Sequence, residues 1–213
     1  MKSAAFGRLV AGPVGSGKTT SCIMELFRRS LEQEKAPDGY RYTRFAVVRQ
    51  TLKQLKDTVL KDIMKELEGL CTYRVTDNLI LVEFGDIRSE WLLIPLEDPE
   101  DQRRLLSMQL TGAWMSECIE MQVKLVAALS GRCGRYPSGN KGYCTWRGVI
   151  ADTNMPSEGS DWHKFMTDPA NTEWEIFLQP GGLEEHAENL MWLNQTAESV
   201  KLPLDSPERA AIG

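Results

Sequence analysis

The chain has 213 residues, of which 42% are hydrophobic and 26% are charged. These values are ordinary for a soluble globular protein, and this length fits one α/β domain, or one domain with a tail. The formal net charge of −5 argues against nonspecific coating of DNA through bulk charge. The five cysteines form no CxxC pair, which argues against a zinc site and a secreted disulfide framework. A reducing cytoplasm is expected, and no signal peptide or membrane span is predicted.

The predicted elements of the N-terminal third alternate strands with helices. An apolar strand at Phe6 to Ala11 runs into a glycine-rich turn, and a helix is expected from Lys18 to about Glu34. A buried strand is expected at Arg44 to Arg49. Thr51 is then expected to cap a helix that ends near Gly69 and carries an apolar stripe of Leu52, Leu55, Val59, Ile63 and Leu67.

The rest of the chain predicts more strands than helices. An antiparallel meander is expected over 73–75, 79–84 and 87–94, followed by an acidic loop with Pro99. The remaining expected elements are a strand at 110–115, a helix from about 119 to 129, a strand at 148–151 and a strand at 174–179. This order predicts an α/β fold, a doubly wound and mainly parallel sheet with helices on both faces. The meander is expected to form a small antiparallel extension.

The clearest motif is a complete phosphate-binding loop, G-x-x-x-x-G-K-[ST]. Its members are Gly12, Pro13, Val14, Gly15, Ser16, Gly17, Lys18 and Thr19. Glycines let backbone N–H groups approach phosphate, and the N-terminus of the following helix adds partial positive charge. Lys18 is expected to reach the β- and γ-phosphates and the Thr19 hydroxyl to ligate Mg²⁺, so ATP and Mg²⁺ are the predicted cofactors. Chance would produce this pattern in roughly one chain in a hundred of this length.

Hydrolysis of a bound nucleotide requires a group that orients or activates water near the γ-phosphate. Glu117 is the catalytic candidate, because it follows an apolar strand in the manner of a Walker B element. An aspartate usually precedes this glutamate, but here Ser116 could only hydrogen-bond a metal-bound water and brings no charge. The alternative is that Glu117 caps the helix expected near Ile119. With the phosphate loop, Glu117 predicts a P-loop NTPase of the ASCE type.

Six motifs follow one another along the chain: GPVGSGKTT, VVRQTLKQLKDT, LTGAWMSE, GRCGRYPS, GVIADTNMPSEGSDWH and FLQPGGL. In this order they resemble phage terminase large subunits, the ATP-driven motors that move double-stranded DNA into a procapsid. The resemblance spans Gly12 to about Leu190, and GRYPS with DTNMPSEGSDW is more specific than the phosphate loop alone. It implies an ATPase, the motor domain of such a terminase.

The resemblance also implies roles for residues outside the phosphate loop. Thr20 belongs to the GPVGSGKTT motif and would take part in nucleotide binding. Arg49 and Gln50 match the family's segment near the nucleotide, although by themselves they fit a surface arginine and the start of a helix. The coupling motif that senses the γ-phosphate would consist of Asp152, Thr153 and Asn154, which by themselves fit a polar turn after a strand.

The phosphate loop contains no arginine, whereas many terminases carry one that faces the phosphates. An arginine supplied by a neighbouring subunit of a ring is therefore expected to stabilise the transition state. The candidates are Arg103 and Arg104, before the Walker B strand, and Arg132 and Arg135, in GRCGRYPS. Position in the family favours Arg104, with Arg135 second. Each of the four also fits a solvated surface arginine, and the second pair fits a contact to DNA phosphate.

Residues 1–195 are expected to form the ATPase domain, and residues 196–213 a linker toward a nuclease domain that is not expected here. The resemblance implies four partners: double-stranded DNA, the portal protein of the procapsid, the small terminase subunit, and further copies of the chain in a ring, expected to be a pentamer. The expected location is the host cytoplasm, with transient docking on the procapsid and no membrane. Two other functions fit a phosphate loop: a small-molecule kinase with Arg103 and Arg104 as lid arginines, or another nucleotide-dependent DNA translocase or helicase.

Overall fold

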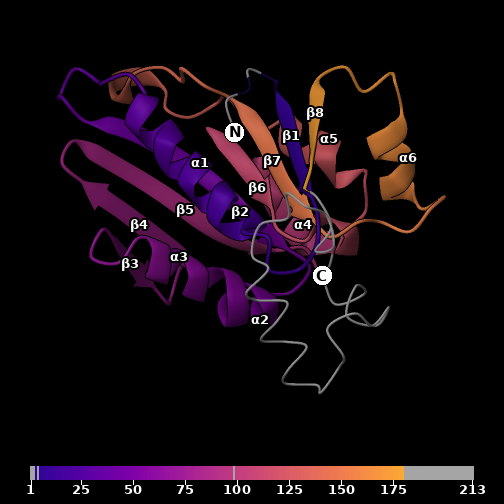
Figure 1. The fold of residues 1–213 in the computed structure, drawn as a ribbon. Helices are drawn as coiled ribbons and strands as arrows, with labels where there is room; N and C mark the ends of the chain where they lie inside the picture. Colours follow the sequence, from indigo (N-terminus) through magenta and orange to yellow (C-terminus); the bar gives the residue numbers. More distant parts are fainter. Residues whose placement is uncertain (1–2, 4, 98, 180–213) are drawn as a thin grey trace.

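Eight strands form one sheet in the computed structural model, which describes residues 3, 5–97 and 99–179 (Figure 1). Across the sheet the strands run in the order β3-β4-β5-β2-β6-β7-β1-β8. Their bounds are β1 Gly7–Ala11, β2 Arg41–Arg49, β3 Cys71–Arg74, β4 Leu79–Phe84, β5 Ile87–Pro95, β6 Gly112–Met115, β7 Gly148–Thr153 and β8 Trp174–Leu178. Strands β5, β2, β6, β7, β1 and β8 pair in parallel, and β3, β4 and β5 pair antiparallel. The predicted fold class, including the antiparallel extension, is confirmed.

Helices cover both faces of this sheet. Their bounds are α1 Lys18–Glu32, α2 Leu52–Gln54, α3 Leu60–Glu66, α4 Pro99–Ser107, α5 Leu125–Ser130 and α6 Asp161–Thr167. Helix α1 packs with α3 on one face, and α4 packs with α5 on the other. Within the described part of the chain, no helix combines the length and the apolar composition needed to cross a membrane.

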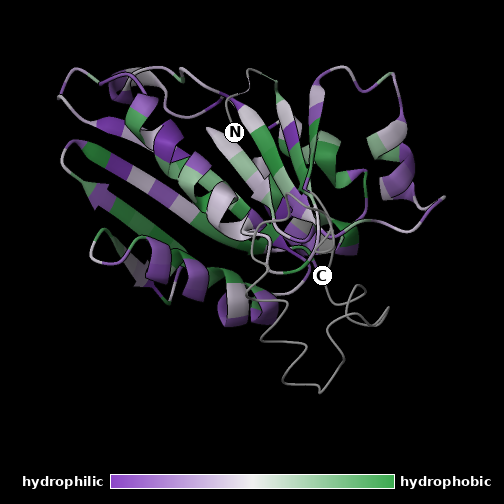
Figure 2. Ribbon diagram, in the orientation of Figure 1, coloured by the Kyte–Doolittle hydropathy of each residue, from purple (hydrophilic) through white to green (hydrophobic). Residues whose placement is uncertain are grey.

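Two apolar layers hold the helices against the sheet. The layer under α1 contains Cys22, Ile23 and Leu26 of that helix, packed with strand residues such as Trp114 and Ile150. The layer on the other face joins α4 and α5 to the sheet through residues that include Leu105, Leu125, Leu129, Met115 and Ala151. Figure 2 shows apolar residues along the central strands and polar residues on the outward side of α3.

The helical stretch after β2 begins as predicted. The Thr51 hydroxyl accepts a hydrogen bond from the Gln54 N–H at 3.1 Å, and the Gln54 side chain accepts one from the Thr51 N–H at 3.0 Å. This reciprocal pair is a capping box. The stretch then contains α2, a π-helical turn (η1, Leu55–Val59) and α3. Most of the predicted apolar stripe is fully buried, namely Leu55, Val59, Ile63 and Leu67.

Two predicted segments are wrong in detail. The acidic loop expected around Pro99 is helix α4, whose first turn contains Glu100 and Asp101, where the helix dipole favours acidic residues. The helix expected from 119 to 129 is interrupted: a 3₁₀ turn (η2, Cys118–Glu120) is followed by extended backbone at Met121. The Trp162 indole N–H donates to the Met121 carbonyl at 2.7 Å, so a tertiary contact replaces a helical hydrogen bond there.

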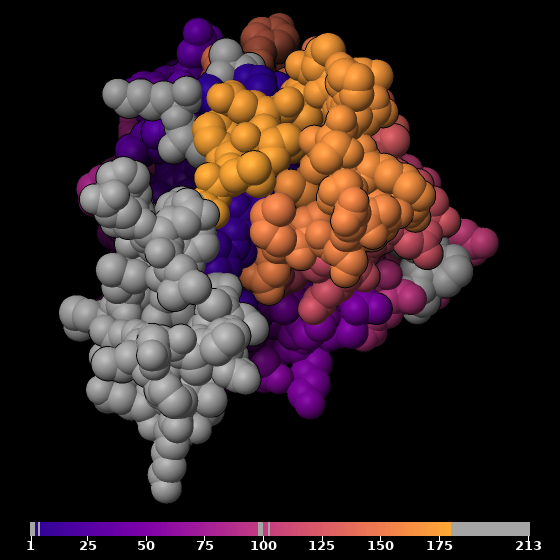
Figure 3. Space-filling view, turned by 45° about the vertical axis from the view of Figure 1, so that its right-hand side comes forward, coloured from indigo at the N-terminus to yellow at the C-terminus, as the bar shows by residue number. Residues whose placement is uncertain are grey.

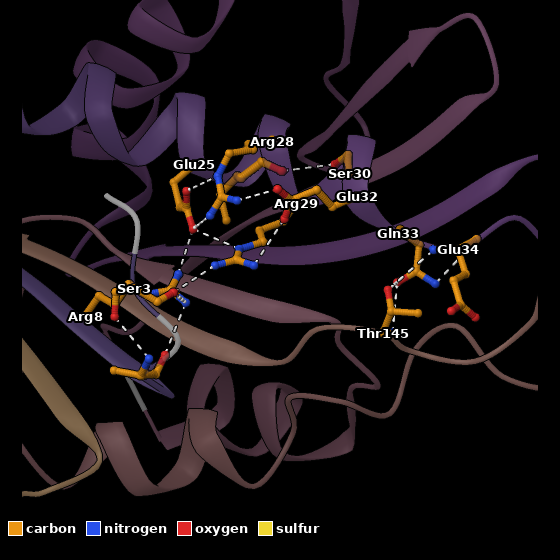
Figure 4. A network of polar contacts seen from close by, with 12 residues as sticks. Ser3, Arg8, Glu25, Arg28, Arg29, Ser30, Glu32, Gln33, Glu34 and Thr145 are labelled. Carbon is orange, nitrogen blue, oxygen red and sulfur yellow. Dashed lines mark hydrogen bonds and ion pairs between the residues drawn. The ribbon is translucent and has the colours of Figure 1, made fainter.

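A buried ion-pair network fastens α1 to β1 (Figure 4). Arg8, the second residue of β1, is fully buried and donates to the Glu25 carboxylate at 2.7 Å. Arg28 and Arg29 donate to the same carboxylate at 2.7 and 2.8 Å, and these hydrogen bonds oppose the effect of burial and leave the pKa of Glu25 lowered. The Arg8 guanidinium also donates to the Ser3 carbonyl at 2.9 Å. Because β1 and α1 flank the phosphate loop, this network holds both of its ends.

Replacing Glu25 with alanine is expected to lower the free energy of unfolding by about 3–5 kcal/mol, because it leaves the Arg8 charge buried and unpaired. Urea denaturation followed by circular dichroism would measure the loss. The matched control is Glu32→Ala, which removes a carboxylate that also pairs with Arg28 and Arg29 but whose side chain is 48% exposed. The control should cost no more than about 1 kcal/mol. Equal losses in the two variants would contradict this account.

Candidate functional site

The carboxyl ends of four parallel strands meet at one edge of the sheet. Strand β1 leads into the phosphate loop, β7 leads into Asn154, β6 leads into Ser116 and Glu117, and β2 ends at Arg49. Segments that are far apart in the sequence are therefore neighbours at this edge. Open parallel sheets bind their ligands at such an edge, so it is the candidate site.

The backbone of the phosphate loop is shaped to receive an anion. Gly15 and Gly17 have φ values of 78° and 79°, in the left-handed region that residues with a Cβ rarely adopt. Gly17 is also the N-cap of α1, so it offers no capping side chain, and the first turn of α1 contains no acidic residue. The N–H groups of that turn are thus left for an anionic ligand. The backbone is thus compatible with phosphate binding by this loop, which stays a prediction.

The side chain of Lys18 folds back over the loop. Its ammonium group donates to the carbonyl oxygens of the first two loop residues, at 2.9 and 2.7 Å, and to Asn154 Oδ1 at 3.1 Å. Lys18 is only 6% exposed. Burial lowers its pKa, and the negative charges of Glu117 and Asp152 oppose that shift. A phosphate oxygen would give the ammonium an anionic acceptor in place of neutral ones, which is a stronger hydrogen bond.

Glu117 lies at a sharp bend after β6. Its backbone is left-handed, with φ 49° and ψ 56°, which is unusual for a residue other than glycine and is typical of functional sites. The turn η2 that follows receives no capping hydrogen bond from the Glu117 side chain, so the structure does not support the helix-cap alternative. The charge of Glu117 instead raises the pKa values of Lys18 and Asp152. This position suits a carboxylate that acts on water beside a bound phosphate.

Asp152 is fully buried in β7, although the sequence alone placed it in a polar turn. Its Oδ1 atom accepts a hydrogen bond from the Trp114 indole N–H at 2.5 Å, and its Oδ2 atom has no hydrogen-bond partner. Burial raises the pKa of Asp152 to about 7, the Trp114 hydrogen bond lowers it, and the charge of Glu117 raises it further. The charge of Lys18 and a backbone hydrogen bond from Glu117 also lower the pKa, but burial outweighs them, so an ionised carboxylate remains costly here.

The other two residues of the predicted coupling motif lie at the same edge. Asn154 reaches the site through its hydrogen bond to Lys18. Thr153 is the last residue of β7 and is fully buried, and its hydroxyl has no hydrogen-bond partner. Its carbonyl accepts the Gly12 N–H at 3.2 Å, which ties the start of the phosphate loop to β7.

Three further predicted residues lie around the site but point elsewhere in this structure. Arg49 donates to the Thr58 hydroxyl at 2.6 Å and lies 3.5 Å from the Glu120 carboxylate. Thr20 is exposed and donates to Glu66 at 3.2 Å, toward α3 rather than toward the loop. Gln50 is exposed just beyond β2. Their contact with a nucleotide stays a prediction.

Ser116 is 2% exposed, and its N–H donates to the Val48 carbonyl at 2.9 Å. This bond continues the pairing of β6 with β2 by one residue. Ser116, which was predicted to hydrogen-bond a metal-bound water, is therefore held at the edge of the sheet between Arg49 and β7.

Gln179, which follows β8, contacts the phosphate loop from another side. Its N–H donates to the Ala11 carbonyl at 2.8 Å, its amide N–H to the Ser16 carbonyl at 3.2 Å, and its Oε1 accepts from the Ser16 hydroxyl. A Cβ at Gly12 would lie only 2.6 Å from the Cβ of Gln179, which explains the glycine there. The FLQPGGL motif contains Gln179 but gave no role to it, because only the strand order brings β8 beside β1. Figure 3 shows this last described segment, in orange, next to N-terminal residues in indigo.

The two predicted finger arginines lie away from the phosphate loop of their own chain. Arg104 is exposed on α4, which packs against β5 and α5 on the face opposite to α1. Strands β2, β6 and β7 separate β5 from β1. Arg135 is exposed, and its N–H donates to the carbonyl of Leu110, before the amino end of β6. Neither arginine can complete this site in cis.

Comparisons with solved structures bear on the fold that carries these residues. The large terminase of a thermophilic bacteriophage in complex with ATP-gamma-S matches with a TM-score of 0.65 and 13% identity, over 91% of this chain and 44% of that one. The large terminase ATPase domain of Thermus phage P74-26 matches at 0.56 and 14%, over 92% and 84%. The HK97 bacteriophage large terminase matches at 0.58 and 11%, over 97% and 42%. No protein-family model matches the chain, and no curated protein sequence matches it.

The chain has the fold of a phage large terminase ATPase domain. It spans less than half the length of the thermophilic-phage and HK97 large terminases, and most of the P74-26 ATPase domain. The resemblance inferred from the sequence motifs is thus matched by the fold. The predicted boundary between an ATPase domain and a linker at residue 195 lies outside the described residues.

Proposed function

We propose that the chain is an ATPase that supplies the motor domain of a phage DNA-packaging terminase large subunit. The observation that carries this proposal is the position of Lys18 in a complete phosphate loop, with the Glu117 carboxylate beside it at the end of β6. The terminase ATPase fold around these residues supports the choice of motor over other ATPases. A kinase lid has no support, because Arg103 and Arg104 lie on α4, on the face opposite to α1.

The proposed binding step uses groups that are already in place. The N–H groups of the phosphate loop and of the first turn of α1 would surround the β- and γ-phosphates of ATP. Lys18 would turn from the loop carbonyls and Asn154 toward the phosphate oxygens. Asn154 would register this change, because it loses a hydrogen bond when the lysine leaves.

The residues at the edge also fit a magnesium ion. The Asp152 Oδ2 atom is buried without a hydrogen-bond partner, as expected for a carboxylate that would bind a cation or a water molecule on that cation. Thr19 and Ser116 would hold the ion together with the phosphates. Bound Mg²⁺ supplies positive charge to the phosphate oxygens. Glu117 would orient the attacking water and accept its proton in line with the γ-phosphate.

Coupling to DNA is proposed through assembly. The partners we propose are double-stranded DNA, the portal protein of the procapsid, the small terminase subunit and further copies of the chain, in a ring of five. The proposed location is the host cytoplasm, with transient docking on the procapsid. The net charge of −5 gives a single copy little electrostatic hold on DNA, so a ring is the natural unit for translocation.

Replacing Lys18 with alanine is expected to abolish tight ATP binding, because it removes the cation that meets the β- and γ-phosphates. Isothermal titration calorimetry with ATP and Mg²⁺ would measure the affinity. Lys35→Ala is the control, since that lysine lies after α1 and pairs with Asp86. Unchanged affinity in a folded Lys18→Ala protein would overturn the proposed site.

Replacing Glu117 with glutamine is expected to keep ATP binding and to lower hydrolysis by roughly 10² or more, because the amide cannot accept a proton. Phosphate release would measure turnover in the full packaging assembly. Glu120→Gln, three residues further along, is the control and should keep most of the activity. Near-normal turnover by Glu117→Gln would reduce Glu117 to a structural role.

We also propose that Arg104 acts in the site of a neighbouring subunit, with Arg135 as the second candidate. Mixing Arg104→Ala subunits with Lys18→Ala subunits is expected to restore part of the activity that each variant alone loses. In a mixed ring some interfaces combine an intact phosphate loop with an intact arginine. Such an arginine typically raises the rate of hydrolysis by about 10³-fold or more. Assembly would be checked by light scattering. No recovery at any ratio would rule out Arg104.

A further inference from the structure

Asp152 carries a buried negative group whose hydrogen bonding is incomplete. The side chain is fully buried, Oδ1 accepts the Trp114 indole N–H, and Oδ2 has no partner. A structural acceptor for an indole N–H needs no charge, because a neutral amide oxygen would accept the same bond. Burying a carboxylate for that purpose alone would cost more free energy than burying a neutral acceptor that makes the same hydrogen bond. The Lys18 ammonium offsets part of this cost, but burial still raises the pKa of Asp152, so the remaining cost calls for another explanation.

The position of Asp152 links it to the phosphate site. Met115 pairs with Ala151 in the β6–β7 register, so Asp152 lies beside Ser116, one residue further on. Alternation along each strand places Asp152 on the same face as Ile150, and Ser116 on the same face as Trp114. Both apolar residues belong to the layer under α1.

Helix α1 begins with the residues that meet the ligand, and it packs across β7. The charge of Asp152 is close enough to act on Lys18 and on Cys22, one turn further along α1. Asp152 therefore faces the same space as the start of α1, below the phosphate loop. That is the side on which Thr19 would hold the metal.

Ser116 stands where the Walker B element would place a carboxylate, and it has no charge to offer. We propose that Asp152 supplies the missing carboxylate from the neighbouring strand and positions the magnesium ion, or a water bound to it, against the phosphate loop. The inference rests on the proposed ATP site, and it assigns a positioning role in metal–nucleotide binding to a residue of β7. The Trp114 hydrogen bond fixes one oxygen, which leaves Oδ2 to face the ion.

The test separates metal-dependent from metal-independent binding. Affinity for ATP is measured by calorimetry with Mg²⁺ and again with excess EDTA, using the wild-type chain and Asp152→Asn. Asparagine keeps an oxygen acceptor for Trp114 and removes only the charge. The expected result is a loss of roughly tenfold or more in affinity for ATP with Mg²⁺ and little change without the metal.

Two further variants make the result specific. Trp114→Phe removes the indole N–H but keeps the carboxylate, so it should preserve most of the gain in affinity that Mg²⁺ provides. Adding Ser116→Asp to Asp152→Asn moves the carboxylate back to β6 and should restore that gain. If Asp152→Asn fails to fold, the same measurements are made on Asp152→Ser, and circular dichroism verifies each variant.

The outcomes distinguish this inference from the proposed function. A wild-type chain that does not bind ATP would overturn both. A wild-type chain that binds ATP, with a variant at 152 that keeps the full gain from Mg²⁺, would overturn the inference alone. Equal losses with and without the metal would assign Asp152 a purely structural role and also overturn it.

Discussion

The phosphate site depends on how firmly α1 is held against β1. A phosphate loop needs a constant relation between the strand before it and the helix after it, because that relation sets where its N–H groups point. In this chain the buried Arg8–Glu25 pair provides that relation, reinforced by two further arginines of α1. A buried ion pair contributes little net stability compared with apolar packing, but it fixes the geometry of its partners. Here the pair fixes the position of β1 relative to α1, on either side of the phosphate loop.

The same edge of the sheet collects one cationic and two acidic side chains that offset one another only in part within the described chain. Lys18 donates to neutral oxygens, Glu117 has a left-handed backbone, and Asp152 has an oxygen without a partner. Each arrangement costs free energy in the chain by itself. Such costs gather where a ligand later compensates them. A nucleotide with its metal brings both the anion that Lys18 needs and the cation that the two carboxylates need.

The arginines are arranged differently from the carboxylates. The carboxylates and Lys18 lie together at the carboxyl edge, whereas Arg104 and Arg135 are exposed at other parts of the surface. Arg49, at the end of the neighbouring strand β2, contacts Thr58 and Glu120. A phosphate loop without an arginine is consistent with the proposal that a neighbouring copy supplies one for the transition state. Such a dependence would allow the subunits of the proposed ring to hydrolyse ATP one after another.

The sequence by itself determined the segment of the phosphate loop, most of the strands and the antiparallel meander, because each depends on local patterns of residue types. It also placed the Thr51 cap, to which the structure adds the reciprocal hydrogen bond from Gln54. It missed helices α4 and α6. The helix predicted from about Ile119 was wrong in detail, because the Met121 carbonyl accepts the Trp162 indole N–H and the backbone there is extended. Only the tertiary structure showed that Asp152 is buried beside Ser116 and that Gln179 holds Ser16. Those relations arise from the order of strands in the sheet, and a parallel sheet joins residues whose distance along the chain leaves no local pattern.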